Sequence, residues 1–173
     1  MYYGEIKNCD IANGTGVRVS LFVSGCTNRC KDCFQKQTWD FNYGKPFTDE
    51  TQDKIIELLY KPYINGLTLL GGEPFEPANQ KDILPFLRKV KKVLPNKSIW
   101  AYSGFTFEEL IDKNSYAHCG ETDEILSIID VLVDGKFISE LKNISLKFRG
   151  SENQRIIDVK KTLQKKELVL YDK

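Results

Sequence analysis

The sequence has little net charge, one histidine and no long apolar run. Its 25 basic and 24 acidic side chains leave a net charge of +1, which argues against a nucleic-acid binder that relies on a broad basic surface. The one histidine, His118, has no nucleophile–base pattern around it, so a catalytic histidine dyad is not expected. No segment approaches the roughly 18 apolar residues of a membrane span. We expect neither a nucleic-acid partner nor a membrane partner.

The start of the chain also lacks the apolar region of a secretory signal peptide, because Glu5, Lys7, Asn8 and Asp10 interrupt it. We therefore expect a cytoplasmic protein, in a compartment where thiols stay reduced. In that compartment the five cysteines are better interpreted as metal ligands or free thiols than as disulfides. A length of 173 residues suits one domain, 1–173, and no linker or repeat divides the sequence.

Three cysteines, Cys26, Cys30 and Cys33, follow an apolar, β-branched segment that is predicted as a strand. Their spacing suits a loop that wraps one metal centre. A cluster of four irons and four sulfides normally takes four cysteine ligands, so three would leave one iron open. Catalytic zinc sites keep a free position in the same way.

A structural zinc site is the alternative, with Cys9, Cys119 or His118 as the fourth ligand. Such a chain would be a zinc-stabilised interaction module. Zinc sites usually present paired C-x-x-C motifs, and only Cys30 and Cys33 have that form here. The iron–sulfur interpretation is therefore favoured, and Cys9 and Cys119 are most simply structural thiols.

Strand and helix patterns alternate along most of the chain. Strands are predicted at 17–23, 67–70, 98–102 and 131–133, helices at 48–61, 79–94, 106–110 and 122–129, and further β-rich segments at 144–148, 155–159 and 167–171. This alternation predicts an α/β fold with right-handed βαβ units and a parallel sheet. A complete (β/α)₈ barrel needs about 250 residues, so the chain suits a partial (incomplete) TIM-like (β/α) barrel of about five to six βα units. The loops that carry the motifs should gather at one rim.

The cysteine loop resembles that of the radical S-adenosylmethionine (radical SAM) superfamily. More narrowly, the sequence is similar to the activating proteins of anaerobic (class III) ribonucleotide reductases. The segments that carry this resemblance are 18–24, 25–34 with Thr38-Trp39, 71–75, 102–110, 130–137 and 148–155. Together they span nearly the whole chain.

The resemblance implies a radical SAM type of partial barrel and two cofactors. A [4Fe-4S] cluster would bind Cys26, Cys30 and Cys33, and S-adenosyl-L-methionine (SAM) would bind the fourth iron. Reduction would cleave SAM to a 5′-deoxyadenosyl radical, which takes a hydrogen atom from a glycine of the large, glycyl-radical subunit of the reductase. The cofactors, and no catalytic side chain, would carry this chemistry. An external one-electron donor such as flavodoxin is implied.

The cofactor-binding residues expected beside the cysteines follow from the same motifs. Gly71 and Gly72 let the backbone approach a ligand closely, and Glu73 would complement the ammonium group of SAM. Asp134 would accept from ribose hydroxyls and Lys136 would pair with the carboxylate of SAM, whereas Ser103 is a weaker candidate. The alternatives are a tight turn for 71–74 and an ordinary polar strand end for Asp134.

One position departs from the superfamily. Many members carry an aromatic residue just before the third cysteine, to lie along the adenine, but Asp32 precedes Cys33 here and Phe34 follows it. We count Asp32, Cys33 and Phe34 among the cofactor-binding residues. Arg149–Arg155 belongs to the resemblance without a chemical signature of its own, so contact with either cofactor or partner stays open. Activation of another glycyl-radical enzyme, or radical chemistry on a metabolite such as a deazapurine precursor, also stays open.

Overall fold

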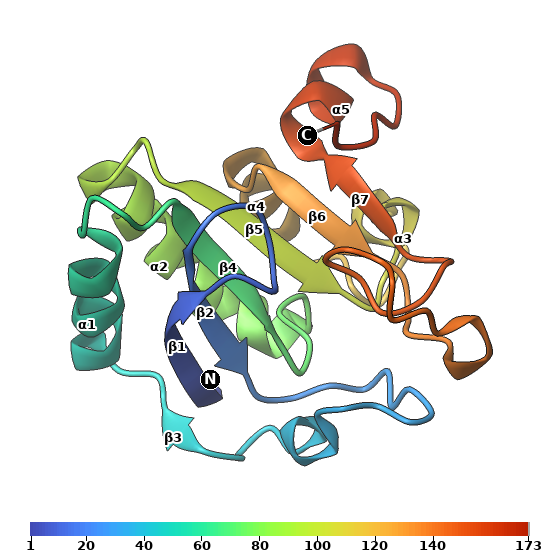
Figure 1. Ribbon diagram of the computed structural model, residues 1–173, viewed down its shortest axis with the longest axis horizontal. Helices are drawn as coiled ribbons and strands as arrows, with labels where there is room; N and C mark the ends of the chain where they lie inside the picture. The colour runs from blue at the N-terminus through green and yellow to red at the C-terminus, as the bar shows by residue number, and fades with distance from the viewer. Residues whose placement is uncertain (173) are drawn as a thin grey trace.

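The computed structural model describes residues 1–172. Within them, one seven-stranded sheet has the order β3-β1-β2-β4-β5-β6-β7, with five α-helices around it (Figure 1). The strands are β1 (Tyr2–Asp10), β2 (Arg18–Val23), β3 (Lys45–Pro46), β4 (Gly66–Gly71), β5 (Ser98–Ser103), β6 (Val131–Asp134) and β7 (Arg155–Asp158). The helices are α1 (Asp49–Leu59), α2 (Pro77–Val93), α3 (Phe107–Ile111), α4 (Thr122–Ile128) and α5 (Val159–Lys165), with short 3₁₀ helices η1 (Lys36–Trp39) and η2 (Ser139–Leu141).

The centre of the sheet is parallel and its edges are antiparallel. Strands β2, β4, β5 and β6 pair in parallel, whereas β1 pairs with β2 and β7 pairs with β6 in antiparallel fashion. The mixed α/β class is therefore confirmed. The parallel strands are fewer than the expected five or six units, because the chain adds its edge strands without helical crossovers.

Helices cover one face of this sheet and form the main core. Ile55 and Leu59 of α1, Ile83 and Leu87 of α2, and Leu126 of α4 are all buried in one apolar cluster with the strands. Figure 1 shows α2 and α4 behind the sheet. The 3.6-residue period of apolar side chains therefore did indicate these helices correctly.

Helix α2 begins earlier than the sequence suggested. The predicted helix began at residue 79, but Glu76 is the N-cap and Pro77 begins the helix, where the fixed φ of proline is favourable. Asn79 instead donates hydrogen bonds from its Nδ2 to the carbonyl oxygens of Ser24 and Glu73, both at 3.0 Å. It joins the ends of β2 and β4.

Two of the predicted late strands are wrong, and two strands, β1 and β3, were missed. Residues 144–148 form no strand, and Phe148 has a φ of 64°, which interrupts extended backbone. Residues 167–171 form only the bridge between Leu170 and Ile157. Strand β1 was missed because several of its residues are polar and exposed, so it lacks a clear apolar alternation.

The four parallel strands end at one edge of the sheet, as expected. The cysteine loop (residues 24–35), the 71–74 turn, Ser103-Gly104 and the turn after Asp134 follow β2, β4, β5 and β6 respectively (Figure 1). Within residues 1–172, no helix combines the length and apolar character that crossing a bilayer requires.

Candidate functional site

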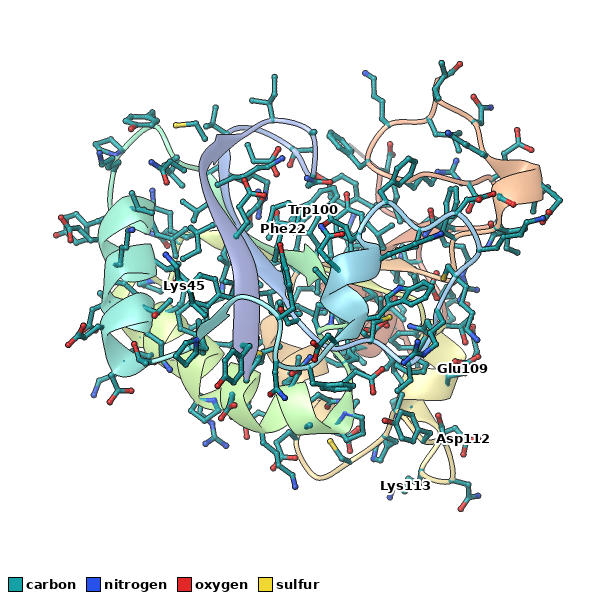
Figure 2. The ribbon with its side chains drawn as sticks, turned by 90° about the horizontal axis from the view of Figure 1, so that it is seen from below. Phe22, Lys45, Trp100, Glu109, Asp112 and Lys113 are labelled. Carbon is teal, nitrogen blue, oxygen red and sulfur yellow. The ribbon has the colours of Figure 1, made fainter. Side chains whose placement is uncertain are left out.

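A cavity of about 340 Å³ lies at this edge of the sheet and extends over the face that the helices leave open. Its walls include all three clustered cysteines, Cys26, Cys30 and Cys33. They also include five further residues predicted from the sequence: Phe34, Gly71, Gly72, Glu73 and Ser103. Phe22 extends the wall along β2, and it lies near the centre of the view in Figure 2. Folding therefore brings two motifs separated by about forty residues into one cavity.

The donor set of the cavity fits an incompletely ligated cluster. All five cysteines are free, and neither Cys9 nor Cys119 contributes to the cavity wall. Within residues 1–172, no three His, Cys, Asp or Glu side chains are gathered closely enough to hold a metal ion. The three thiols thus share one wall without forming a closed cage.

Burial disfavours the thiolate form of Cys26 and of Cys30. It raises the pKa of Cys26 to about 11, with a smaller contribution from the charge of Glu73. It also raises the pKa of Cys30. Only the thiolate is a good metal ligand, so metal binding must release the thiol protons. The free energy of metal binding must therefore offset the cost of deprotonation.

Two buried carboxylates hold the first half of the cysteine loop. Glu76 accepts hydrogen bonds at Oε2 from the backbone N–H of Thr27 (2.8 Å) and from its hydroxyl (2.7 Å). The hydroxyl of Tyr116 donates to Oε1 of Glu76 at 2.7 Å. Asn28 donates from Nδ2 to Oε1 of Glu73 at 2.8 Å. Glu76 and Asn28 were not predicted, although an acidic residue three positions after Glu73 was a usable signal.

Glu73 connects three loops at the edge of the sheet. Its side chain is buried and accepts four hydrogen bonds, from Asn28 and the Gly104 backbone at Oε1 and from Ser103 and the Phe75 backbone at Oε2. Burial raises the pKa of Glu73 to about 7 against the effect of these donors. Glu73 therefore supports the cavity wall, and its carboxylate is already occupied by protein donors.

The two glycines allow β2 and β4 to approach closely where they end. Gly71 has a φ of 112°, in the region that favours glycine. A Cβ on Gly72 would lie 2.7 Å from the carbonyl oxygen of Gly25 and 2.8 Å from that of Thr38. The Gly72 backbone N–H donates to Val23 at 2.8 Å. The 71–74 turn is therefore packed against the cysteine loop.

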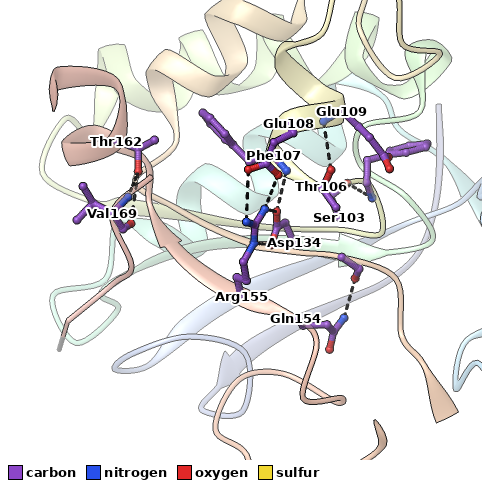
Figure 3. Close-up of polar contacts among 12 residues, drawn as sticks. Ser103, Thr106, Phe107, Glu108, Glu109, Asp134, Gln154, Arg155, Thr162 and Val169 are labelled. Atoms are coloured by element: carbon purple, nitrogen blue, oxygen red, sulfur yellow. Dashed lines mark hydrogen bonds and ion pairs between the residues drawn. The ribbon is translucent and has the colours of Figure 1, made fainter. Parts of the chain in front are cut away.

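Asp134 lies beside the cavity and outside its walls. Arg155 donates from Nε to Oδ1 of Asp134 at 3.0 Å and from Nη2 to Oδ2 at 2.6 Å, and the Phe107 backbone donates to Oδ2 at 2.7 Å (Figure 3). Arg155 also donates to Glu108 at 2.6 Å. The sequence suggested ribose as the partner of Asp134, but in the structure both oxygens bind protein donors.

The remaining predicted residues lie on the rim. Lys136 and Asp32 are exposed and do not line the cavity, and Asp32 has a φ of 60°. Phe34 does line it, although 69% of its surface is exposed. Its ring packs on Phe137 with the ring centres 5.6 Å apart.

Trp39 is a cavity residue that the sequence did not single out as a ligand contact. Its indole nitrogen is buried and is the one such side-chain atom of residues 1–172 without a hydrogen-bond partner. Buried donors are normally paired. An unpaired donor beside the cysteine loop fits a site that receives acceptor atoms, such as sulfides, from a bound group.

Comparison with known proteins agrees with this chemistry. A family model described as a 4Fe-4S single cluster domain matches residues 12–157. The match favours an iron–sulfur cluster over a zinc site.

Relatives cover almost the whole chain, and each is named an anaerobic ribonucleoside-triphosphate reductase-activating protein. The relative from Haemophilus influenzae is 44% identical over 158 residues, 90% of this chain and 97% of its own length. That from Vibrio cholerae is 42% identical over 158 residues, with 90% and 97% covered. That from Escherichia coli is 40% identical over 156 residues, with 89% and 96% covered. The chain belongs to the family of anaerobic ribonucleoside-triphosphate reductase-activating proteins.

Proposed function

We propose that this chain activates an anaerobic ribonucleoside-triphosphate reductase as a radical SAM enzyme and leaves a glycyl radical on the large subunit of that reductase. One observation carries the proposal: Cys26, Cys30 and Cys33 share a cavity with the Gly71–Glu73 turn, and no fourth cysteine lines it. Three thiolates leave one iron of a cubane open. The neighbouring glycine turn offers backbone groups to a ligand bound there.

The residues divide between cluster and cosubstrate. Cys26, Cys30 and Cys33 would hold the [4Fe-4S] cluster, and Gly71, Gly72 and Ser103 would contact SAM. When bound, the two groups supply a one-electron reductive cleavage that generates a 5′-deoxyadenosyl radical. The role of the polypeptide is to position both groups and to exclude competing reactions.

Several side chains would affect the site indirectly, because they hold in place the loops that form its wall. Glu73 and Glu76 fix the cysteine loop against the 71–74 turn through Asn28 and Thr27. Asp134 is held by Arg155, which orients the turn that carries Gly135 in the cavity wall. Lys136 and Asp32 stay candidates for contact with SAM only if the rim closes over it.

The same proposal extends to the fold and to the source of electrons. The four parallel strands with loops gathered at their carboxyl ends suit a partial barrel of the radical SAM type, built as one domain over 1–173. A sheet that does not close leaves an opening through which a glycine loop of the partner could enter. A one-electron donor such as flavodoxin would reduce the cluster.

An anaerobic reconstitution tests this function. The protein is loaded with iron and sulfide, reduced with dithionite, and mixed with SAM and the large subunit of the reductase. We expect 5′-deoxyadenosine as a product and a glycine-centred electron paramagnetic resonance signal on the reductase. A preparation with one zinc and no sulfide, or SAM cleavage without any glycyl signal, would contradict the proposal.

A further inference from the structure

The 20 residues between β6 and β7 form an ordered excursion at the rim of the cavity. Within residues 135–154, Gln154 donates from Nε2 to the Gly135 carbonyl at 2.9 Å, and Asn153 donates from Nδ2 to the Lys136 carbonyl at 2.8 Å. The backbone N–H of Glu152 donates to Leu141 at 2.9 Å. These bonds connect the outgoing and returning halves. The excursion therefore has a defined shape of its own.

This excursion lies against the cysteine loop. Lys31 and Glu140 form an ion pair at 3.6 Å, and the Lys142 ammonium lies 5.2 Å from the centre of the Phe34 ring. Figures 1 and 2 both show the segment beyond β6 (orange) beside the loop beyond β2 (light blue). Phe137 and Gly150 of the excursion line the cavity itself. Both loops therefore contribute to the cavity wall.

Apolar side chains project from this rim into solvent. Ile144 is 91% exposed and Phe34 is 69% exposed, and the neighbouring Ile138 and Leu141 are 37% and 38% exposed. Single exposed apolar residues are ordinary, but several of them on two adjoining loops that contribute to a cavity wall are a sign of an interaction site. We call these four residues, together with the basic residues of segments 29–36 and 136–149, the rim surface.

The charge of the rim surface differs from that of the rest of the chain. Residues 29–36 and 136–149 contain seven basic and two acidic side chains, although the whole chain has 25 and 24. Acidic side chains therefore outnumber basic ones elsewhere. Because complementary charge steers association and selects partners, the rim surface fits an acidic protein surface with an apolar centre.

We propose that the rim surface is the docking site for the reductase, whose acidic surface around the target glycine covers the mouth of the cavity. The inference rests on the proposed function. A hydrogen atom can move from the glycine Cα only when that carbon reaches the cavity, so the partner must cover the rim. An electron donor need not cover it, because an electron crosses intervening protein. For the block Arg149–Arg155, whose role the sequence left open, this proposal assigns partner contact to residues 149–154 in the returning half of the excursion. Arg155 instead begins β7 and binds Asp134 and Glu108.

A double variant of exposed residues tests the docking site. Ile144→Asp/Lys147→Glu inverts the apolar and basic character of the rim surface, away from the predicted cofactor contacts. The matched control is Ile11→Asp/Lys54→Glu, which makes the same changes at Ile11, 74% exposed, and at the exposed Lys54 of α1. Binding to the large subunit is measured anaerobically with the cluster-loaded protein at two salt concentrations. SAM cleavage without the reductase is measured in parallel with dithionite.

We expect the rim variant to bind the reductase at least about tenfold more weakly than the control, with a smaller salt dependence and unchanged cleavage of SAM alone. Circular dichroism checks that both variants are folded, and Ile144→Ser provides a milder second change with a smaller loss. Equal binding by rim variant and control would overturn the docking site. Normal dithionite-driven activation with loss only of flavodoxin-driven activation would also overturn it, in favour of the electron donor. Failure of the wild-type protein to cleave SAM would instead contradict the proposed function.

Discussion

The two halves of the cavity wall differ in how far the protein itself organises them. The Gly71–Glu76 half is buried, and the Glu73 carboxylate alone accepts four hydrogen bonds. The cysteine half is more exposed, and Arg29 and Asp32 adopt positive φ values of 47° and 60°, which are unfavourable for residues with a Cβ. Its thiols are not gathered into a metal-binding group within residues 1–172.

This difference suggests a division of work. Under the proposed function, the hydrogen-bonded glycine half would need little rearrangement to bind SAM, which lowers the cost of binding. The cysteine half would need the metal to draw its sulfurs together, because metal binding is coupled to local folding. Glu73 and Glu76 join the halves, since they bind Asn28 and Thr27 of the cysteine loop. The following predictions test this comparison.

The largest effect is expected in the cysteine half. Changing Cys26, Cys30 or Cys33 to Ala should remove the cluster and abolish cleavage of SAM, because two thiolates cannot hold a cubane with an open iron. Iron and sulfide content and 5′-deoxyadenosine formation are the measurements. Cys9→Ser and Cys119→Ser are the controls, since neither residue lines the cavity. Cluster loss in either control would mean that the ligand set is wrong.

Loss of the connection between the halves should mainly affect stability. Glu73→Ala leaves four donors without their acceptor, two of them backbone N–H groups, and should lower the free energy of unfolding by about 3 kcal/mol. Urea denaturation of the metal-free protein measures this. Glu109→Ala on the exposed face of α3 is the control and should change stability by less than about 0.5 kcal/mol. Similar values for both variants would contradict a supporting role for Glu73.

Crowding at the contact between the halves should have a smaller effect. A Cβ at Gly72 would meet two backbone carbonyls, whereas a Cβ at Gly120 has nothing within 4 Å. Gly72→Ala should therefore cost about 1–3 kcal/mol and weaken SAM binding, because backbone has to shift. Gly120→Ala should be nearly neutral. The free energy of unfolding and the equilibrium binding of SAM are measured for both variants. Wild-type stability and SAM binding in Gly72→Ala would show that the close contact is dispensable.

The last prediction concerns the gradual change of stability with pH. Burial raises the pKa of Glu73 from 4.5 to about 7, so the folded protein binds this proton more tightly than the unfolded chain. The contribution of Glu73 to stability is therefore full below about pH 4.5 and is lost as pH rises toward about 7. One proton limits the slope to about 1.4 kcal/mol per pH unit.

Glu73→Gln has no such proton and should flatten this part of the profile. The measurement is the free energy of unfolding of the metal-free wild type and variant between about pH 5 and 8. Parallel profiles would indicate that the hydrogen bonds to Glu73 outweigh its burial.

Much of the fold was predictable because local patterns carried it. The apolar period of α2 and the buried runs of β2 and β4 identified those elements to within about two residues. Strand β1 was not predicted because several of its residues are polar and exposed, which leaves a weak apolar pattern. The segment 144–148 was wrongly predicted as a strand because its apolar residues alternate as they do in a strand. In the structure, however, Ile144 is exposed on the surface.

By itself, the sequence determined the chemistry of the site. The softness and spacing of three thiolates after a predicted strand are properties of the residues, and they favour an iron–sulfur centre over a structural zinc site. Tertiary structure alone decided which polar groups face a ligand and which face the protein. Asp134 binds Arg155, 21 residues away, and Glu76 binds Thr27, 49 residues away. Such partners depend on how the strands pack side by side, which no local pattern encodes.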